Sequence, residues 1–89
     1  MSLEQKFKEA ASAFKALLTP PTEEEYTQCY GLFKQATVGD VNIPDPGMKD
    51  RQEKKKWDAW KGKEGMSKDA AKEEYIKRVD ILVKKDDDD

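Results

Sequence analysis

The sequence predicts an all-α protein, a bundle of four helices in a single small domain. Apolar residues recur at intervals of three and four in four separate segments, and no segment alternates apolar and polar residues as a half-buried strand would. Prolines and glycines separate the four segments. Of the 89 residues 40% are charged, and the mean hydropathy is −1.02. Such a composition is typical of disorder, but the periodic apolar residues indicate a folded domain with a modest core.

The first helix is predicted over residues 3–17. Ser2 and Gln5 have the spacing of a capping box, and Pro20 with Pro21 stops the helical pattern. The apolar face of this helix carries Leu3, Phe7, Ala10, Phe14, Leu17 and Leu18.

One face of the second helix, predicted over residues 22–38 with a second capping-box pattern at its start, has the composition of a binding surface. Tyr30, Phe33 and Lys34 are three and four residues apart, so they project to nearly the same side. Gly31 lies in the middle of this helix, where glycine costs about 1 kcal/mol relative to alanine. It indicates either a close approach by a ligand or by another helix, or a glycine that is merely tolerated.

A long loop follows the second helix. The segment from Gly39 to residue 50 contains Pro44, Pro46 and Gly47 and has no helical periodicity. A loop of about a dozen residues is near the upper end for compact domains. It can run the length of a bundle and join two helices that point the same way.

The third helix is short and is predicted over residues 51–61. Trp57 and Trp60 lie three apart on it, and we expect both to pack in the core or at its rim. Two glycines end this helix, and Ser67 can cap the fourth. The apolar stripe of the fourth helix comprises Ala71, Tyr75, Ile76, Val79, Leu82 and Val83.

The residue content argues against catalysis and metal binding. There is no histidine, which removes the commonest general base and the commonest metal ligand. Cys29 is the only cysteine, so no intrachain disulfide can form, and its helical spacing from Tyr26 and Phe33 predicts a buried, inert thiol. We therefore expect no enzyme activity, no cofactor and no metal site.

The charge distribution divides the chain at residue 85. The net charge of −2 includes four terminal aspartates, and removing those four negative charges leaves a body of +2. We expect a domain over residues 1–85 and an acidic, disordered tail over residues 86–89. The basic residues concentrate in Lys49, Arg51, Lys54, Lys55 and Lys56, a patch that either holds phosphates or is a solvated face.

No apolar run is long enough to cross a bilayer, and no hydrophobic segment opens the chain. These observations predict a cytoplasmic protein without stable membrane anchoring, which we expect to be a monomer.

Four short motifs, taken together with their order and separation, are specific enough to indicate a protein family. They are YGLFKQATVGD at 30–40, PGM at 46–48, KWDAW at 56–60 and YI at 75–76. Through them the chain resembles the acyl-CoA-binding protein family over essentially its whole length. The resemblance implies a four-helix bundle in up-down-down-up order. It also implies an intracellular carrier that binds long-chain fatty acyl-CoA, buffers its pool and serves acyl-CoA-using enzymes transiently.

The resemblance also implies a binding site. Tyr30 and Phe33 would contact the adenosine and phosphate end of coenzyme A, Lys34 and Lys56 the ribose 3'-phosphate, and Tyr75 the adenine. The implied ligand-binding set is Lys15, Tyr30, Gly31, Leu32, Phe33, Lys34, Lys56 and Tyr75.

One alternative of another class is a helical protein-interaction module, which would use the face of the second helix and the basic third helix to dock an acidic or helical partner. Nucleic-acid binding through the lysine patch is disfavoured, because the whole chain is acidic and carries no nucleic-acid motif.

Overall fold

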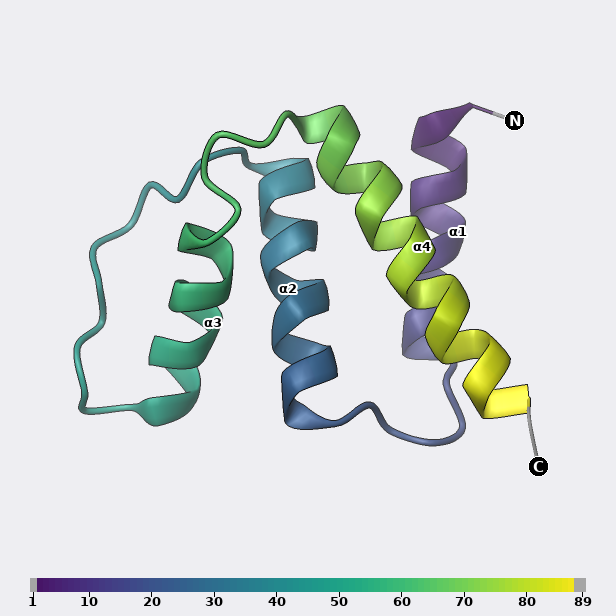
Figure 1. The fold of residues 1–89 in the computed structure, drawn as a ribbon, viewed down its shortest axis with the longest axis horizontal. Helices are drawn as coiled ribbons and strands as arrows, with labels where there is room; N and C mark the ends of the chain where they lie inside the picture. The colour runs from purple at the N-terminus through teal and green to yellow at the C-terminus, as the bar shows by residue number, and fades with distance from the viewer. Residues whose placement is uncertain (1, 88–89) are drawn as a thin grey trace.

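The computed structural model describes residues 2–87, and within them the only regular elements are four α-helices (Figure 1). Their bounds are α1 Leu3–Lys15, α2 Glu23–Thr37, α3 Arg51–Lys61 and α4 Lys68–Asp87. The all-α prediction is confirmed. None of these helices is long and apolar enough to cross a membrane, as judged over the described residues.

The helix starts follow local side-chain chemistry. Ser2 Oγ accepts a hydrogen bond from the N–H of Gln5 at 3.1 Å, which caps α1. At the start of α2, Thr22 Oγ1 accepts from the N–H of Glu25 at 3.1 Å, and Glu25 Oε1 accepts from the N–H of Thr22 at 2.8 Å. The capping box predicted at residue 22 is therefore complete.

The predicted end of α1 was wrong by two residues. The helix ends at Lys15 rather than at residue 17. The N–H of Ala16 is shared between the carbonyls of Ser12 and Ala13, and that of Leu17 bonds to the carbonyl of Phe14, three residues earlier. This tighter turn replaces the α-helical pattern before the two prolines. Leu17 still packs, half-buried, against the core.

The directions of the four successive helices make an up-down-down-up bundle (Figure 1). Helices α1 and α4 run in one direction, and α2 and α3 run in the other. The loop 38–50 returns along α3, which allows α2 and α3 to be parallel, as its length predicted.

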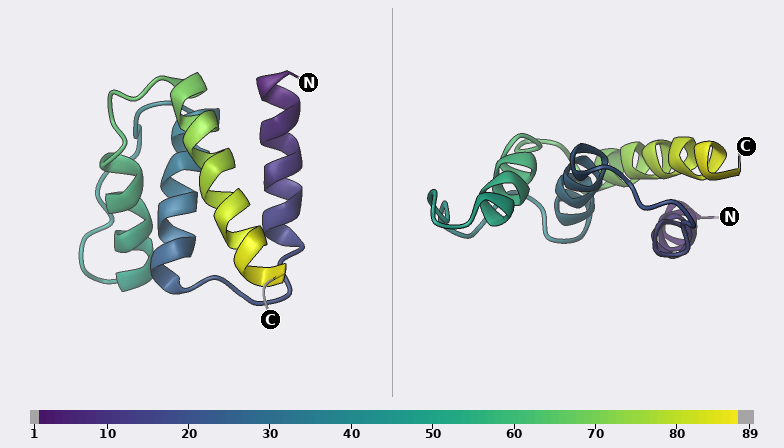
Figure 2. Two further views of the ribbon diagram at one scale, coloured as in Figure 1. Left: turned by 45° about the vertical axis from the view of Figure 1, so that its right-hand side comes forward. Right: turned by 90° about the horizontal axis from the view of Figure 1, so that it is seen from below.

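The bundle is a flattened one. The Cα trace measures 38 × 29 × 15 Å along its principal axes, and the view from below in Figure 2 shows its thinness. Helix α4 packs against both α1 and α2, whereas α3 packs on α2 only. The backbones of α1 and α2 are not in close contact, so α4 bridges the two.

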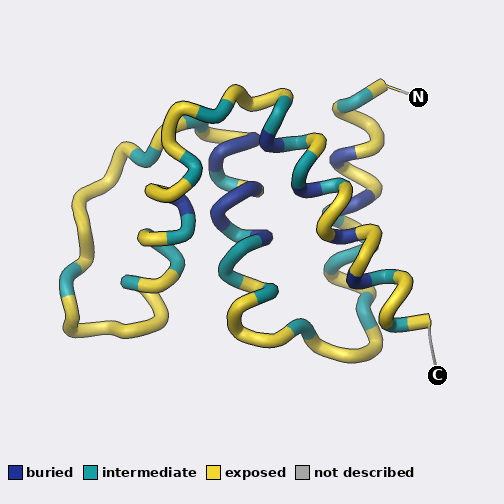
Figure 3. The backbone as a smooth tube through the Cα atoms, viewed as in Figure 1, coloured by how far each residue is buried: buried dark blue, intermediate teal, exposed yellow. Residues whose placement is uncertain are grey.

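The core lies where α4 meets α1 and α2 (Figure 3). Its members are Phe7, Ala10, Cys29, Leu32, Ala36, Ala71, Tyr75, Val79 and Leu82. Cys29 is buried, as the sequence predicted. Burial raises the pKa of its thiol, which disfavours the reactive thiolate.

Helix α3 is attached by its two tryptophans. The indole N–H of Trp60 donates to the carbonyl of Gly39 at 2.7 Å, and that of Trp57 donates to the carbonyl of Ile43 at 2.9 Å. Trp60 is 2% exposed. The predicted packing role of both residues is confirmed, and it holds the loop 38–50 against α3.

A buried amide joins two loops at the C-terminal end of α2. Gln35 Nε2 donates to Asp40 Oδ1 at 2.9 Å and to the carbonyl of Met66 at 2.8 Å. Asp40 Oδ1 also accepts from the N–H of Gly65 at 2.9 Å. These bonds lower the pKa of Asp40 and fix the two loops that flank α3.

The predicted start of the acidic tail at residue 86 was wrong. Asp86 and Asp87 belong to α4, and the Asp86 carboxylate accepts from the N–H groups of Leu18 at 2.9 Å and Thr19 at 2.7 Å. The first aspartate of the run therefore holds the turn between α1 and α2. Asp88 and Asp89 lie outside the described residues.

Candidate functional site

A cleft of about 440 Å³ lies between α1 and α2, with α4 behind it. It exists because both helices pack on α4 without close contact between their own backbones. Its lining residues are Ala11, Phe14, Lys15, Tyr26, Cys29, Tyr30, Phe33, Lys34 and Tyr75. Most of these side chains are apolar or aromatic, and two are cationic, so the cleft suits an amphiphilic anion.

Aromatic rings form one wall of the cleft. The ring of Phe33 stacks on that of Phe7 with centroids 5.5 Å apart, and it lies 5.8 Å from the ring of Tyr75. Phe14 lies 6.5 Å from Tyr75. These separations are typical of packed aromatic pairs, so the wall is preformed. Tyr75 is 4% exposed, and burial raises the pKa of its phenol to about 12.

Two lysines surround Tyr30 at the mouth of the cleft. Lys34 Nζ lies 6.0 Å from the centroid of the Tyr30 ring and 5.5 Å from that of Trp60. From α3, Lys56 Nζ lies 5.4 Å from the Tyr30 centroid and 5.8 Å from the Tyr26 centroid. The aromatic faces therefore hold both ammonium groups beside the cleft.

The lysines at the cleft have few carboxylate partners. Among the described residues no carboxylate lies within 4.0 Å of the Lys15 or Lys34 ammonium, and that of Lys56 has only Glu53, at 3.7 Å. An anion that enters the cleft would therefore meet cations that are not already neutralised.

Two other lysines of the basic patch are paired within the molecule. Lys54 pairs with Asp45 and, at 3.2 Å, with Asp58, and Lys55 pairs with Glu23 at 2.7 Å. The Asp45 contact raises the pKa of Lys54. These two lysines fasten α3 to the loop and to α2, so only Lys56 of the three turns toward the cleft.

The structure brings together five of the eight residues expected at the binding site, namely Lys15, Tyr30, Phe33, Lys34 and Tyr75. A sixth, Lys56, stands at the edge of the cleft. It lines a second hollow of about 460 Å³ together with Pro20, Pro21, Glu23, Tyr26, Thr27 and Gln52.

Gly31 and Leu32 are not among the lining residues. A Cβ at Gly31 would lie 2.6 Å from the carbonyl oxygen of Ala59, so this glycine admits the backbone of α3 rather than a ligand. Leu32 is 1% exposed and belongs to the core. Both were expected as part of the site that the resemblance implies, and of the two approaches that the position of Gly31 indicated, the structure has the approach by another helix. Consecutive residues of a helix face different directions, so Tyr30, Gly31 and Leu32 cannot all face the cleft.

Four lining residues were not predicted as part of the site: Ala11, Phe14, Tyr26 and Cys29. Two have a signal in the sequence, since Ala11 precedes Lys15 by one helical turn and Tyr26 precedes Tyr30 by one turn. Cys29 was assigned to the core, and it borders the cleft from there.

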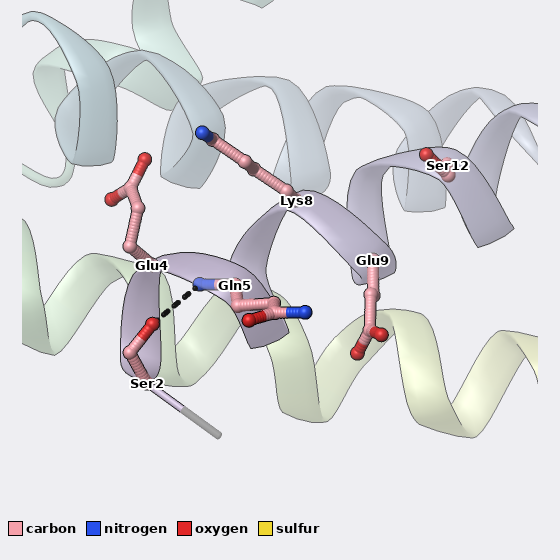
Figure 4. Close-up of a pocket in the computed structure, with 6 residues that line it drawn as sticks. All are labelled: Ser2, Glu4, Gln5, Lys8, Glu9 and Ser12. Atoms are coloured by element: carbon pink, nitrogen blue, oxygen red, sulfur yellow. Dashed lines mark hydrogen bonds between the residues drawn. The ribbon is translucent and has the colours of Figure 1, made fainter.

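A separate hollow on the outside of α1 is no candidate (Figure 4). Its residues are Ser2, Glu4, Gln5, Lys8, Glu9 and Ser12. All belong to α1 or its cap, so no second element closes over it. Glu4 is also paired with Lys72 of α4 at 2.7 Å, which lowers the pKa of Glu4.

The described residues contain no cluster of three or more acidic, cysteine or histidine side chains that could hold a metal ion.

Comparisons with known proteins converge on one family. The family model described as "Acyl CoA binding protein" matches residues 4–79. An acyl-CoA-binding protein of Gossypium hirsutum is 48% identical over 82 residues, which cover 92% of each chain. Among solved structures, acyl-CoA-binding protein 2 of Oryza sativa has a TM-score of 0.88 at 40% identity, covering 94% of this chain and 93% of its own. The ACBP of Moniliophthora perniciosa also has a TM-score of 0.88, at 44% identity, covering 98% of this chain and 85% of its own.

Proposed function

The chain belongs to the acyl-CoA-binding protein family, and from this premise we propose that it binds long-chain fatty acyl-CoA in the α1–α2 cleft and carries it without catalysis. The observation that supports this most directly is one cleft that combines an aromatic wall with two lining lysines, Lys15 and Lys34, and with Lys56 at its edge. A long-chain acyl-CoA has the matching chemistry, with an apolar chain, an adenine ring and several phosphates.

The two parts of the ligand make different demands. Burying ten methylenes contributes on the order of 8 kcal/mol before ordering costs, at about 0.8 kcal/mol each. Lys15, Lys34 and Lys56 then select for the phosphates, because charge-assisted hydrogen bonds are worth about 1.5–3 kcal/mol. Free coenzyme A lacks the chain and free fatty acid lacks the phosphates, so we expect each to bind far more weakly than the ester.

The site residues in this proposal are Lys15, Tyr30, Phe33, Lys34, Lys56 and Tyr75. Tyr30 and Phe33 offer ring faces to the adenosine end, and the lysines come from three helices, as the binding of a multiply charged group requires. No observation favours the protein-interaction alternative, and Lys54 and Lys55 of the basic patch are engaged within the molecule.

Calorimetric titration with palmitoyl-CoA, coenzyme A and palmitate tests the proposal, with the ester kept below its micelle-forming concentration. We expect tight one-to-one binding of the ester alone. Absence of ester binding would refute the proposed function.

The Lys34→Ala variant tests the site itself. We expect it to bind palmitoyl-CoA about 10-fold to 100-fold more weakly, because one charge-assisted contact is lost, with its melting temperature retained. Lys77→Ala is the matched control, since Lys77 lies on α4 with a side chain 73% exposed and does not line the cleft. Equal affinity of the two variants would remove Lys34 from the site.

A further inference from the structure

The C-terminal end of α4 lies beside the turn that follows α1 (Figure 1). There the Asp86 carboxylate accepts hydrogen bonds from the N–H groups of Leu18 and Thr19, three and four residues after Lys15. From the structure we infer that Asp86 is a positioning residue for the ligand site, because it holds the last turn of α1 where Lys15 lines the cleft. This inference rests on the proposed binding of acyl-CoA.

The wall of the cleft that α1 forms needs such an anchor. Helix α1 packs on α4, and its backbone makes no close contact with α2 across the cleft. Lys15 is the last residue of α1, and the ends of helices fray unless other contacts hold them. It is also the one residue that α1 contributes to the proposed ligand-binding set. Its ammonium group therefore meets the ligand only when the last turn of α1 keeps its place.

The two hydrogen bonds to α4 act where the side-chain packing of the turn ends. Leu17 is half-buried against the core, but the Leu18 side chain is 87% exposed and cannot anchor the chain. At the other end of α1, Glu4 pairs with Lys72 of α4 at 2.7 Å. That ion pair lies eleven residues before Lys15 in the same helix, or about 16 Å away at about 1.5 Å per residue. The α4 carboxylate is therefore the contact that fixes the backbone just after Lys15.

Charge and position predict opposite effects of removing Asp86. As a charge, this carboxylate repels a ligand that carries several phosphates, so its loss would strengthen binding. As an anchor, it raises the fraction of molecules in which Lys15 is in place, so its loss would weaken binding. A released turn that is competent about one third of the time lowers the affinity of Asp86→Ala for palmitoyl-CoA about threefold.

The experiment is a pair of double-mutant cycles, measured by calorimetric titration with palmitoyl-CoA below its micelle-forming concentration. Asp86→Ala should cause no further loss of affinity in a Lys15→Ala background, because it acts through Lys15. In a Lys34→Ala background it should still cost about threefold, because Lys34 is carried by α2. A general loosening of the fold would weaken binding in both backgrounds alike, so the two cycles distinguish positioning from stability.

Two neutral replacements of Asp86 separate hydrogen bonding from charge. Asp86→Asn keeps an oxygen that can accept one of the two N–H groups, so its affinity should lie between those of the native protein and of Asp86→Ala. Asp87→Ala is the matched control, since Asp87 is exposed and its replacement removes the same charge one residue further on. It should bind no more weakly than the native protein. Thermal unfolding confirms that each variant is folded, and Asp86→Asn carries the same cycles if Asp86→Ala does not fold.

The outcomes separate the positioning role from the carrier function. A loss in Asp86→Ala that disappears in the Lys15→Ala background supports the positioning role. Unchanged or tighter binding by Asp86→Ala, an equal loss in both lysine backgrounds, or native affinity in Lys15→Ala would overturn it while leaving the carrier function standing. A native protein that binds no palmitoyl-CoA would overturn both.

Discussion

Replacing Gly31 by alanine sets two physical effects against each other. Alanine is favoured over glycine in a helix interior by about 1 kcal/mol, so helix propensity alone predicts a more stable protein. The structure predicts the opposite, because the added Cβ would stand 2.6 Å from the carbonyl oxygen of Ala59 and 2.8 Å from its carbonyl carbon. Those atoms belong to the backbone of α3, so no side chain can rotate away.

The destabilisation expected from the added Cβ follows from these distances. Ordinary van der Waals contact begins at 3.4 Å, so α3 would have to withdraw by about 0.8 Å, the difference between 3.4 and 2.6 Å. Forcing extra volume into a packed contact costs about 1–3 kcal/mol. After the propensity gain, we expect Gly31→Ala to lower the free energy of unfolding by about 1 kcal/mol, or about 4–8 °C in melting temperature.

Urea unfolding measures the stability, and tryptophan emission reports the position of α3, because both tryptophans of the chain lie on that helix. The pair Lys77→Ala and Lys77→Gly, at an exposed position of α4, calibrates the propensity term in this protein. A gain of about 1 kcal/mol in Gly31→Ala, with unchanged emission, would refute the close packing of α2 on α3.

Two further predictions concern the dependence of stability on pH, one for Asp86 and one for Tyr75. Asp86 has a pKa lowered by the N–H groups of Leu18 and Thr19, so its stabilising contribution is present above the unfolded pKa of about 3.9 and is lost as the pH falls through the folded value. Asp86→Asn should therefore lower the melting temperature at neutral pH and flatten its dependence on pH in the acid range; an unchanged acid profile would count against the tether. Tyr75 has a pKa raised to about 12 by burial, so the native state holds its proton after the unfolded state, with a tyrosine pKa of about 10, has lost it. Stability should fall between about pH 10 and pH 12, and a spectrophotometric titration should show one of the three tyrosines ionising last; loss of that late step in Tyr75→Phe assigns it, and its survival would show that another residue causes it.

Local chemistry explains how far the fold could be predicted. The caps at Ser2, Thr22 and Ser67 and the apolar spacing of each helix are short-range features, and the structure confirms them. The end of α1 was missed by two residues, where the hydrogen bonds change to a tighter turn before the two prolines. The extension of α4 was missed because it involves Asp86 bonding to Leu18 and Thr19, some 67 residues away in the chain.

The candidate site divides in the same way. The residues at helical spacing, Tyr30, Phe33 and Lys34, were expected on one face, and they do line the cleft. The spacing could not predict which neighbour each helix face contacts. In the structure Gly31 faces α3, and Tyr26 lines both the cleft and the second hollow. Helix periodicity predicts the direction in which a side chain points from its helix axis, but it does not predict which helix, loop or cleft lies in that direction.

The sequence by itself determined the four helices, the absence of histidine chemistry and the family. Only the tertiary structure decided that α1 and α2 share α4 without touching each other's backbones, which opens the cleft between them. The physical reason is that hydrogen bonds within a helix are fixed by neighbours along the chain, whereas a cleft is the space left by how separate helices pack.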